Sequence, residues 1–496
     1  MQSGIFATKS IEHLHDEADQ ACGLKRTLGA FDLITLGIGA IIGAGLFVRT
    51  AAAAANNAGP SVTLGFIVAA VGCAFAGLCY AEFASMIPVA GSAYTYSYAT
   101  MGELVAWIIG WDLVLEYAIG AATVGIAWSE YLNKLLEYFG WRVPYGWCHS
   151  PFESLRDAAG TVTAHGIMNV PALFIVLTLS LLLIRGIKES ALVNGLIVIA
   201  KVAIVILFIA FGWGYINPAN HDPYIPAVST FVDSQGVSHN FGGLMGILGA
   251  GGVVFFAFVG FDAVSTAAQE SRNPKRDMPI GILGSLVICT VLYILFAHVL
   301  TGVASVEDFR TQGREASVAY AITTYMHGNE WLAKFVTVAI LAGFSSVILV
   351  MLLGQSRVFF SMSRDGLLPK IFSEVHPRFC TPYKSNLILF VFVGAFAAFV
   401  PGDIVGDMTS IGTLFAFILV CIGVWILRVR RPELPRQFRT PLVPLVPILG
   451  ILVCGAMIVG LGWTNWTRLG AWLLIGLAVY GGYGWRRSKL RHPNGA

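Results

Sequence analysis

The feature that most constrains the fold of this chain is a series of long apolar runs separated by short clusters of charge. A helix needs about 20 apolar residues to cross the hydrocarbon core of a bilayer. Charged residues make up only 12% of the 496 residues, whereas soluble domains carry about 25%. Because backbone groups cannot stay unpaired in lipid, the runs predict membrane-spanning helices, and their unbroken apolarity excludes barrel strands.

These runs predict an all-α polytopic membrane protein with twelve transmembrane helices. The ninth run is short and the tenth follows it closely, so the boundary between them is the least well marked. The predicted helices cover residues 31–54, 61–87, 103–131, 168–186, 192–216, 243–268, 280–304, 333–362, 386–400, 404–428, 445–463 and 469–486.

Lysine and arginine residues gather in alternate connecting segments, and this bias sets the orientation. If the N-terminus is cytoplasmic, most basic residues fall on the cytoplasmic side, with dense clusters at 428–439 and 486–491. The first apolar run is too long for a cleavable signal peptide. We therefore expect a multi-pass protein of a bacterial inner membrane or a plasma membrane, with both termini cytoplasmic.

Two of the predicted helices are rich in glycine at matching positions. The first has four glycines within residues 37–45, and each costs roughly 1 kcal/mol against alanine in a helix. On glycine content alone, close helix packing explains this segment as well as an interruption does. The sixth predicted helix also carries mid-span glycines, followed by Asp262. Interrupted helices in corresponding places of two halves indicate a transporter binding site.

The two halves would each contain five helices and run in opposite senses through the membrane, because five is odd. This 5+5 inverted repeat divides the chain into five parts. They are a cytoplasmic N-terminal segment (1–30), the first repeat (31–216), the second repeat (243–428), two additional helices (445–486) and a cytoplasmic tail (487–496).

An interruption within 37–45 offers binding groups of both signs. The N–H groups that begin the outer half-helix have no intrahelical acceptor, and the helix dipole adds about half a positive charge there. Such a helix start suits a carboxylate, while the free carbonyls that end the inner half-helix suit an ammonium group. The physics therefore favours a zwitterionic amino acid as the substrate.

The order of several motifs resembles the amino acid–polyamine–organocation superfamily and, within it, the cationic amino acid transporter family. The resemblance implies the LeuT-like inverted-repeat fold with interrupted helices 1 and 6, twelve or more spans, and transport by alternating access. The motifs that carry it are 37–45, 88–94, 111–117, 256–265 leading into 270–274, and 363–369.

The resemblance also assigns roles to particular residues. It implies that amides near Gly43, Ala44 and Gly45 hold the substrate carboxylate, and that an aromatic gate stands at Phe256. Many relatives have Ser or Thr at the place of Ala44, so one hydroxyl contact is missing here. The carbonyls implied to hold the substrate ammonium belong to Ile41, Phe256, Ala257 and Val259.

Lys201 is the clearest functional candidate among the ionisable residues inside the predicted helices, because no other charged residue lies near it in its apolar run. It sits about 13 Å along that helix, close to mid-bilayer, and desolvation favours its neutral form. We expect it to take the place of a coupling sodium ion and to make transport proton-coupled; a static structural cation is the alternative. Ser345 and Ser346 either line the site beside Lys201 or bond back to their own helix.

Glu116 lies midway along the third predicted helix, and three roles stay open for it. It recognises a cationic substrate side chain, serves as a second proton site, or is a hydrogen-bonded core residue. Asp262 is expected to tie the interrupted backbone together. Glu82 and Asp112 are expected to be structural.

Together these features predict a proton-coupled symporter of small or medium neutral L-amino acids, with cationic amino acid transport or exchange as the alternative. An amino acid sensor on the same scaffold is the alternative from another class. The chain has no metalloprotease, nucleotide-binding or metal-cluster motif, so we expect no enzyme activity, cofactor or metal. The expected partners are the amino acid, protons and membrane lipid, without nucleic acid, for a monomeric chain.

Overall fold

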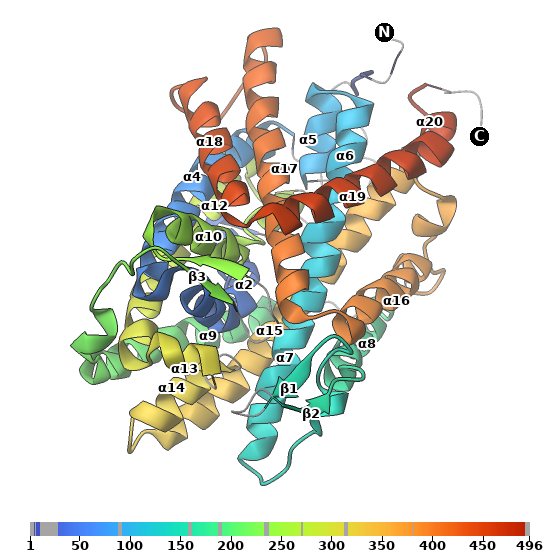
Figure 1. The fold of residues 1–496 in the computed structure, drawn as a ribbon. Helices are drawn as coiled ribbons and strands as arrows, with labels where there is room; N and C mark the ends of the chain where they lie inside the picture. The colour runs from blue at the N-terminus through green and yellow to red at the C-terminus, as the bar shows by residue number, and fades with distance from the viewer. Residues whose placement is uncertain are drawn as a thin grey trace.

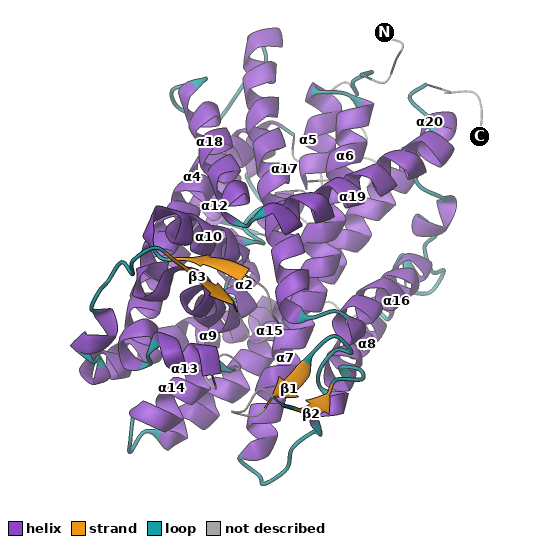
Figure 2. Cartoon of the chain, in the orientation of Figure 1, coloured by secondary structure: helices purple, strands orange, loops and turns teal. Residues whose placement is uncertain are grey.

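The computed structural model describes residues 4, 6–9, 28–87, 92–156, 161–186, 191–232, 238–268, 271–311, 316–379 and 381–491. Helices dominate this part of the chain (Figure 2), and the strands form two short hairpins. Most of the predicted segment 1–30 lies outside the described residues, as do 88–91 and Glu270 from the motifs.

The first half of the chain folds into helices separated by short turns (Figure 1). Several helices continue into π-helical turns, labelled η, without a break. The elements are α2 (Ala30–Ile41), η1 (Gly45–Arg49), α3 (Thr50–Ala53), η2 (Ala54–Ala58), α4 (Val62–Met86), α5 (Ser92–Thr100), α6 (Glu103–Val114), η4 (Leu115–Ile119), α7 (Gly120–Glu137), α8 (Val170–Ile184) and α9 (Ala191–Gly212).

The second half repeats this pattern of long helices and short connections, and a 3-10 turn, η8, interrupts its first helix. The elements are α10 (Gly243–Val254), η8 (Phe255–Phe258), α11 (Ala263–Thr266), α12 (Pro274–Val303), α13 (Val306–Thr311), α14 (Ser317–Tyr325), α15 (Glu330–Arg364), α16 (Tyr383–Phe399), α17 (Gly402–Arg430), α18 (Leu445–Gly460), α19 (Trp463–Val479), η11 (Tyr480–Gly484) and α20 (Trp485–Arg487).

Seven helical segments in the described part are long and apolar enough to cross a bilayer, which makes this a polytopic helical membrane protein. Three shorter apolar helices, α2, α8 and α16, accompany them. The helices α18 and α19, predicted as two separate spans, meet at 111° across a short break, and the pair passes the same test as one bent span. Figure 1 shows α19 crossing the bundle obliquely as a result.

Both glycine-rich segments are interrupted. The helix α2 ends at Ile41, Ile42 is extended with ψ of 104°, and helical structure resumes at Gly45. In the second segment the 3-10 turn η8 ends at Phe258 and is followed by Gly260 with φ of +109°. Only glycine adopts this backbone conformation readily. The choice left open between close packing and an interruption is therefore settled in favour of an interruption.

The two strand pairs lie in segments that the charge bias places outside the membrane. The strand β1 (Ser154–Arg156) pairs antiparallel with β2 (Val162–His165), between α7 and α8. The strand β3 (Ser229–Val232) pairs antiparallel with β4 (Ser238–Phe241), between α9 and α10. These hairpins shape the connections and contribute no residue to the interrupted helices.

The helices pack around one continuous apolar core that contains both interruptions. The helix α12 packs along α2 and α4, while α15 packs along α7 and α9. The helices α8 and α16 lie side by side at the edge of the bundle (Figure 1). This arrangement places α9, α12 and α15 around the interruption that follows α2.

Candidate functional site

The two interruptions touch each other through their backbones. A Cβ atom built on Gly45 would lie 2.2 Å from the Cα of Ala257, which no real contact permits. A Cβ on Gly260 would lie 3.0 Å from the carbonyl oxygen of Ala40. Glycine is required at Gly45 because the facing atoms are main chain and cannot rotate away. The structure therefore brings together the residues that the sequence places in two separate helices.

In the half of the first segment that follows the interruption, helical hydrogen bonding begins at the carbonyl of Gly43. Its carbonyl accepts hydrogen bonds from the amides of Leu46, at 3.2 Å, and of Phe47, at 3.4 Å. The amides of Ala44 and Gly45 therefore precede the first intrahelical bond, and such amides have no acceptor within their own helix. This is the arrangement that binds an anionic group at a helix start.

Two of the four carbonyls implied to hold an ammonium group converge on one point. The hydroxyl of Tyr293, on α12, donates to the carbonyl of Ile41 at 3.0 Å and lies 3.1 Å from that of Ala257. A single polar hydrogen-bonding group therefore bridges the two interruptions. The carbonyl of Phe256 accepts from the amide of Val259 at 3.2 Å and keeps a second lone pair.

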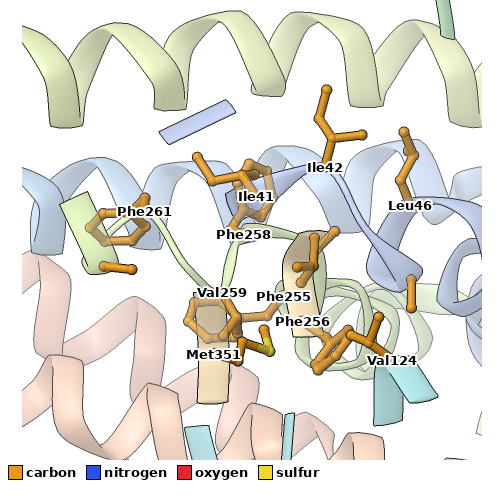
Figure 3. Packing of buried hydrophobic residues seen from close by; sticks show 14 of the residues in the cluster. Ile41, Ile42, Leu46, Val124, Phe255, Phe256, Phe258, Val259, Phe261 and Met351 are labelled. Atoms are coloured by element: carbon orange, nitrogen blue, oxygen red, sulfur yellow. The ribbon is translucent and has the colours of Figure 1, made fainter. Parts of the chain in front are cut away.

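Neighbouring side chains cover both interruptions. Figure 3 shows Ile41 and Ile42 at the end of one segment and Phe255, Phe256, Phe258 and Val259 in the other, within a cluster of apolar side chains. Phe256, implied to be a gate, is only 3% exposed. The site is therefore closed around its polar groups in this structure.

Lys201 reaches the first interruption from α9. Its ammonium nitrogen donates to the carbonyl oxygen of Gly39 at 2.7 Å, and the side chain is 1% exposed. Gly39 lies in the last turn of α2, where carbonyls lack intrahelical donors. The side chain of Lys201 thus supplies a donor to a carbonyl at the end of the half-helix α2.

One face of α15 covers both Lys201 and the interruption. A Cβ on Gly343 would lie 2.8 Å from the Cε of Lys201, and a Cβ on Gly43 would lie 3.3 Å from the Cγ2 of Val347. Ser346 lies on this same face, three residues after Gly343, and its buried hydroxyl has no partner within the described chain. Ser345 instead donates to the carbonyl of Leu341 in its own helix, at 2.9 Å. Of the two roles considered for this serine, the structure shows the bond back to its own helix.

Glu116 lies on the π-helical turn η4, and its side chain is fully buried. Neither of its carboxylate oxygens has a hydrogen-bond partner among the described residues. Its carboxyl lies close to those of Asp262 and Asp112, which are also fully buried. The three carboxyls therefore form one acidic cluster in the apolar interior. π-Helical turns often mark functional sites.

Asp262 ties the second interruption to the third predicted span. Its Oδ2 accepts from the hydroxyl of Tyr117 at 2.5 Å and of Ser92 at 3.4 Å. Asp112 has no hydrogen-bond partner for either oxygen within the described chain. Glu82 sits elsewhere and accepts a bidentate pair of bonds from Arg428, at 2.8 and 2.9 Å, which is a structural ion pair.

Charged residues also connect the helix ends on both sides of the site. Arg49, at the outer end of η1, is 4% exposed and forms ion pairs with Asp403, at 3.0 Å, and Asp407 of α17. On the opposite side, Lys9 forms an ion pair with Asp365 at 2.7 Å. These ion pairs link segments that lie far apart in the sequence.

The sequence interpretation did not single out Tyr293 or Arg49. Tyr293 is a lone tyrosine in an apolar run, and nothing in one sequence shows that its hydroxyl meets carbonyls of two other helices. Arg49 carries a detectable signal, because a charged residue at a span end that becomes buried needs an acidic partner. The sequence does not show which acidic residue that partner is, since Asp403 and Asp407 are about 350 residues away along the chain.

Comparison of the sequence with known proteins assigns the chain to a family. Residues 28–470 match the sequence model described as amino acid permease. The chain is 43% identical over 492 residues to the branched-chain amino acid permease BcaP of Bacillus subtilis (strain 168), covering 99% of this chain and 100% of the relative. It is 39% identical over 488 residues to the methylthioribose transporter of the same organism, covering 98% and 99%.

A more distant relative comes from a plant. The vacuolar cationic amino acid transporter 4 of Arabidopsis thaliana is 34% identical over 442 residues, covering 87% of this chain and 68% of the relative. The resemblance that the motifs carry is thus confirmed by relatives in bacteria and plants. Because the family match spans residues 28–470, the chain belongs to the amino acid permease family of the amino acid–polyamine–organocation superfamily.

Proposed function

We propose that this protein is a secondary active transporter that carries small or medium neutral L-amino acids together with protons by alternating access. The observation that carries the proposal is the contact between the two interruptions, where Gly45, in the first turn after the interruption, lies against the main chain of Ala257. Donors for a carboxylate and acceptors for an ammonium group meet there without a charged side chain from the protein. An α-amino acid matches both sets.

The fold that this mechanism requires is the LeuT-like inverted repeat with twelve spans. It comprises repeats at 31–216 and 243–428, additional helices at 445–486, and cytoplasmic segments at 1–30 and 487–496. The placement of both termini on one side is supported by two contacts at Asp365. Its carboxylate accepts from Lys9, and its backbone carbonyl accepts from the amide of Lys489 at 3.1 Å. We place the protein in a cell membrane as a monomer.

Proton coupling is assigned to Lys201. Protonation changes its charge at a carbonyl of α2, directly before the interruption, so the proton and the substrate act on the same half-helix. Ser346 on α15 offers a buried hydroxyl on the adjoining helix face. The coupling follows because the charged amine and the neutral amine stabilise the end of α2 to different extents.

The substrate class is assigned from the side chains that surround the two interruptions. The side chains there are apolar, among them Phe256, Val259 and Ile41, which suits a neutral side chain. The relative named branched-chain amino acid permease is consistent with this class. Cationic amino acids are the second candidate, because Glu116 and its two neighbouring carboxyls are acidic groups with no basic ion-pair partner among the described residues.

Counterflow in liposomes tests the proposal. Purified protein is reconstituted into vesicles loaded with unlabelled amino acid, and the entry of labelled leucine is followed with each of the twenty amino acids as competitor. A carrier gives saturable exchange that neutral amino acids inhibit. Binding without exchange would identify a sensor instead, and flux that does not saturate would identify a channel. An inward proton gradient should raise net uptake, whereas a sodium gradient should not.

A further inference from the structure

A groove lies at the surface of the bundle, and none of the residues at the two interruptions lines it. Its volume is about 710 Å³, and it runs along the start of α12 beside the connection between α17 and α18. None of its lining residues is acidic. The residues that line it are Asn273, Lys275, Arg276, Pro279, Ile280, Leu283, Gly284, Gln437 and Phe438.

The groove is cationic at one end and apolar along its wall. Lys275 and Arg276 stand in the first turn of α12, are exposed, and have no acidic ion-pair partner among the described residues. Asp277, the acidic residue of that turn, is buried. Deeper along the helix, Ile280 and Leu283 form the wall, opposite Phe438. Such a gradient from charge to hydrocarbon follows the depth profile of one bilayer leaflet.

The dimensions fit the same leaflet. From Lys275 to Gly284 the α-helix rises about 14 Å, close to half of the hydrocarbon thickness. Beyond the groove, α12 presents a stripe of exposed apolar side chains at helical spacing, including Val287 and Val291, which are 63% and 53% exposed. A chain that starts at the basic end therefore continues along an apolar surface that faces lipid.

We propose that this groove binds a phospholipid with an anionic headgroup from the cytoplasmic leaflet. Lys275 and Arg276 bind the phosphate, the amides of Asn273 and Gln437 donate to its oxygens or to the glycerol, and one acyl chain lies along Ile280 and Leu283. The orientation derived from the basic residues puts this end of α12 at the cytoplasmic face.

The lipid would support the inner half-helix α2 through α12. A Cβ on Gly281 would lie 2.6 Å from the Cβ of Leu33, and a Cβ on Gly284 would lie 3.2 Å from the Cδ1 of Ile34. The wall of the groove is thus the helix against which α2 packs. Occupancy by an anionic lipid should therefore change the rate of any movement of α2 against α12.

Native mass spectrometry of the purified full-length chain tests the site. The protein is equilibrated with mixtures of phosphatidylglycerol and phosphatidylcholine, and the retained lipid is counted. The variant Lys275→Gln/Arg276→Gln should weaken retention of phosphatidylglycerol by roughly thirtyfold, since two basic residues near an anionic lipid are removed. The control Lys370→Gln/Arg486→Gln removes two charges from the same predicted face and should retain it. Equal retention by both variants overturns the proposal.

Two further arms identify the source of the anion. Millimolar inorganic phosphate should not displace the lipid, and Phe438→Ala should weaken lipid retention because it removes part of the apolar wall. Displacement by phosphate together with no effect of Phe438→Ala would show a free-anion site and would also overturn the proposal. Amino acid counterflow by the wild-type protein is measured in parallel. If the wild-type protein retains the lipid but shows no counterflow, the transport function is wrong and the lipid site stands.

Discussion

The Nζ atom of Lys201 lies 2.7 Å from the carbonyl oxygen of Gly39, two residues before α2 ends at Ile41. This bond joins α9 to the inner half of the interrupted helix. A protonated amine strengthens the bond, because a charged donor makes a stronger hydrogen bond to a carbonyl than a neutral one does. In the mechanism proposed above, the protonation state of Lys201 therefore acts directly on the end of α2, beside the interruption.

Lys201→Ala should remove the pH dependence of uptake. The wild-type protein should transport faster as the external pH falls, because the proton loads Lys201 before the site closes. The variant has no titrating group there, so its uptake rate should stay flat across a pH series in proteoliposomes. Lys334→Ala, in a predicted external position, serves as the control and should keep the wild-type profile. A wild-type profile in Lys201→Ala would place the proton site elsewhere.

Gly45→Val should abolish substrate binding. The new side chain would meet the main chain of Ala257 at 2.2 Å, so the two interruptions must separate. A side chain at Gly43 meets the two methyl groups of Val347, at 3.3 and 3.6 Å, so Gly43→Val should act chiefly by restricting the backbone of the interruption. Gly455→Val, on α18, has open space around it and is the matched control. Binding of labelled leucine by scintillation proximity measures all three, and near wild-type binding by Gly45→Val would contradict the assigned site.

The sequence predicts the interruptions and the helix positions well because both depend on local composition. Glycine content marks 37–45, and apolar length marks the helices to within a few residues in most cases. It does not predict the 111° bend between α18 and α19, nor the close approach of Gly460 to the main chain of Leu248 and Gly249. The contact between Gly45 and Ala257, and the bridge made by Tyr293, follow from three helices meeting in space.

Tyr293→Phe should lower stability in the absence of substrate and increase the stabilisation that substrate gives. Without the hydroxyl, the carbonyls of Ile41 and Ala257 lose a donor, which costs about 1–3 kcal/mol for buried groups. A bound ammonium group can satisfy the same carbonyls. Thermal unfolding with and without leucine measures the effect, with Tyr383→Phe as the control. An identical substrate-induced shift in variant and wild type would show that the ammonium binds elsewhere.

Glu116→Gln should separate neutral from cationic substrates. The substitution keeps the shape of the side chain and replaces its ionisable carboxyl, in the cluster with Asp112 and Asp262, by a neutral amide. If Glu116 recognises a cationic side chain, inhibition of counterflow by lysine and arginine should fall while inhibition by leucine is kept. A loss of pH dependence with unchanged selectivity would assign a proton to Glu116. Unchanged transport in every respect would leave it a core residue.

Arg49→Gln should shift the protein toward an outward-open state. The guanidinium of Arg49 joins the outer end of the first segment to Asp403 and Asp407 of α17, and this tie is formed while the site is closed. Removal of the charge breaks both ion pairs, so η1 is no longer held against α17. A cysteine introduced at Ala51 (buried in the wild type) should then react faster with a membrane-impermeant maleimide. Arg49→Lys, which keeps the charge, should restore slow labelling, and equal rates in all three proteins would show that the tie does not control access.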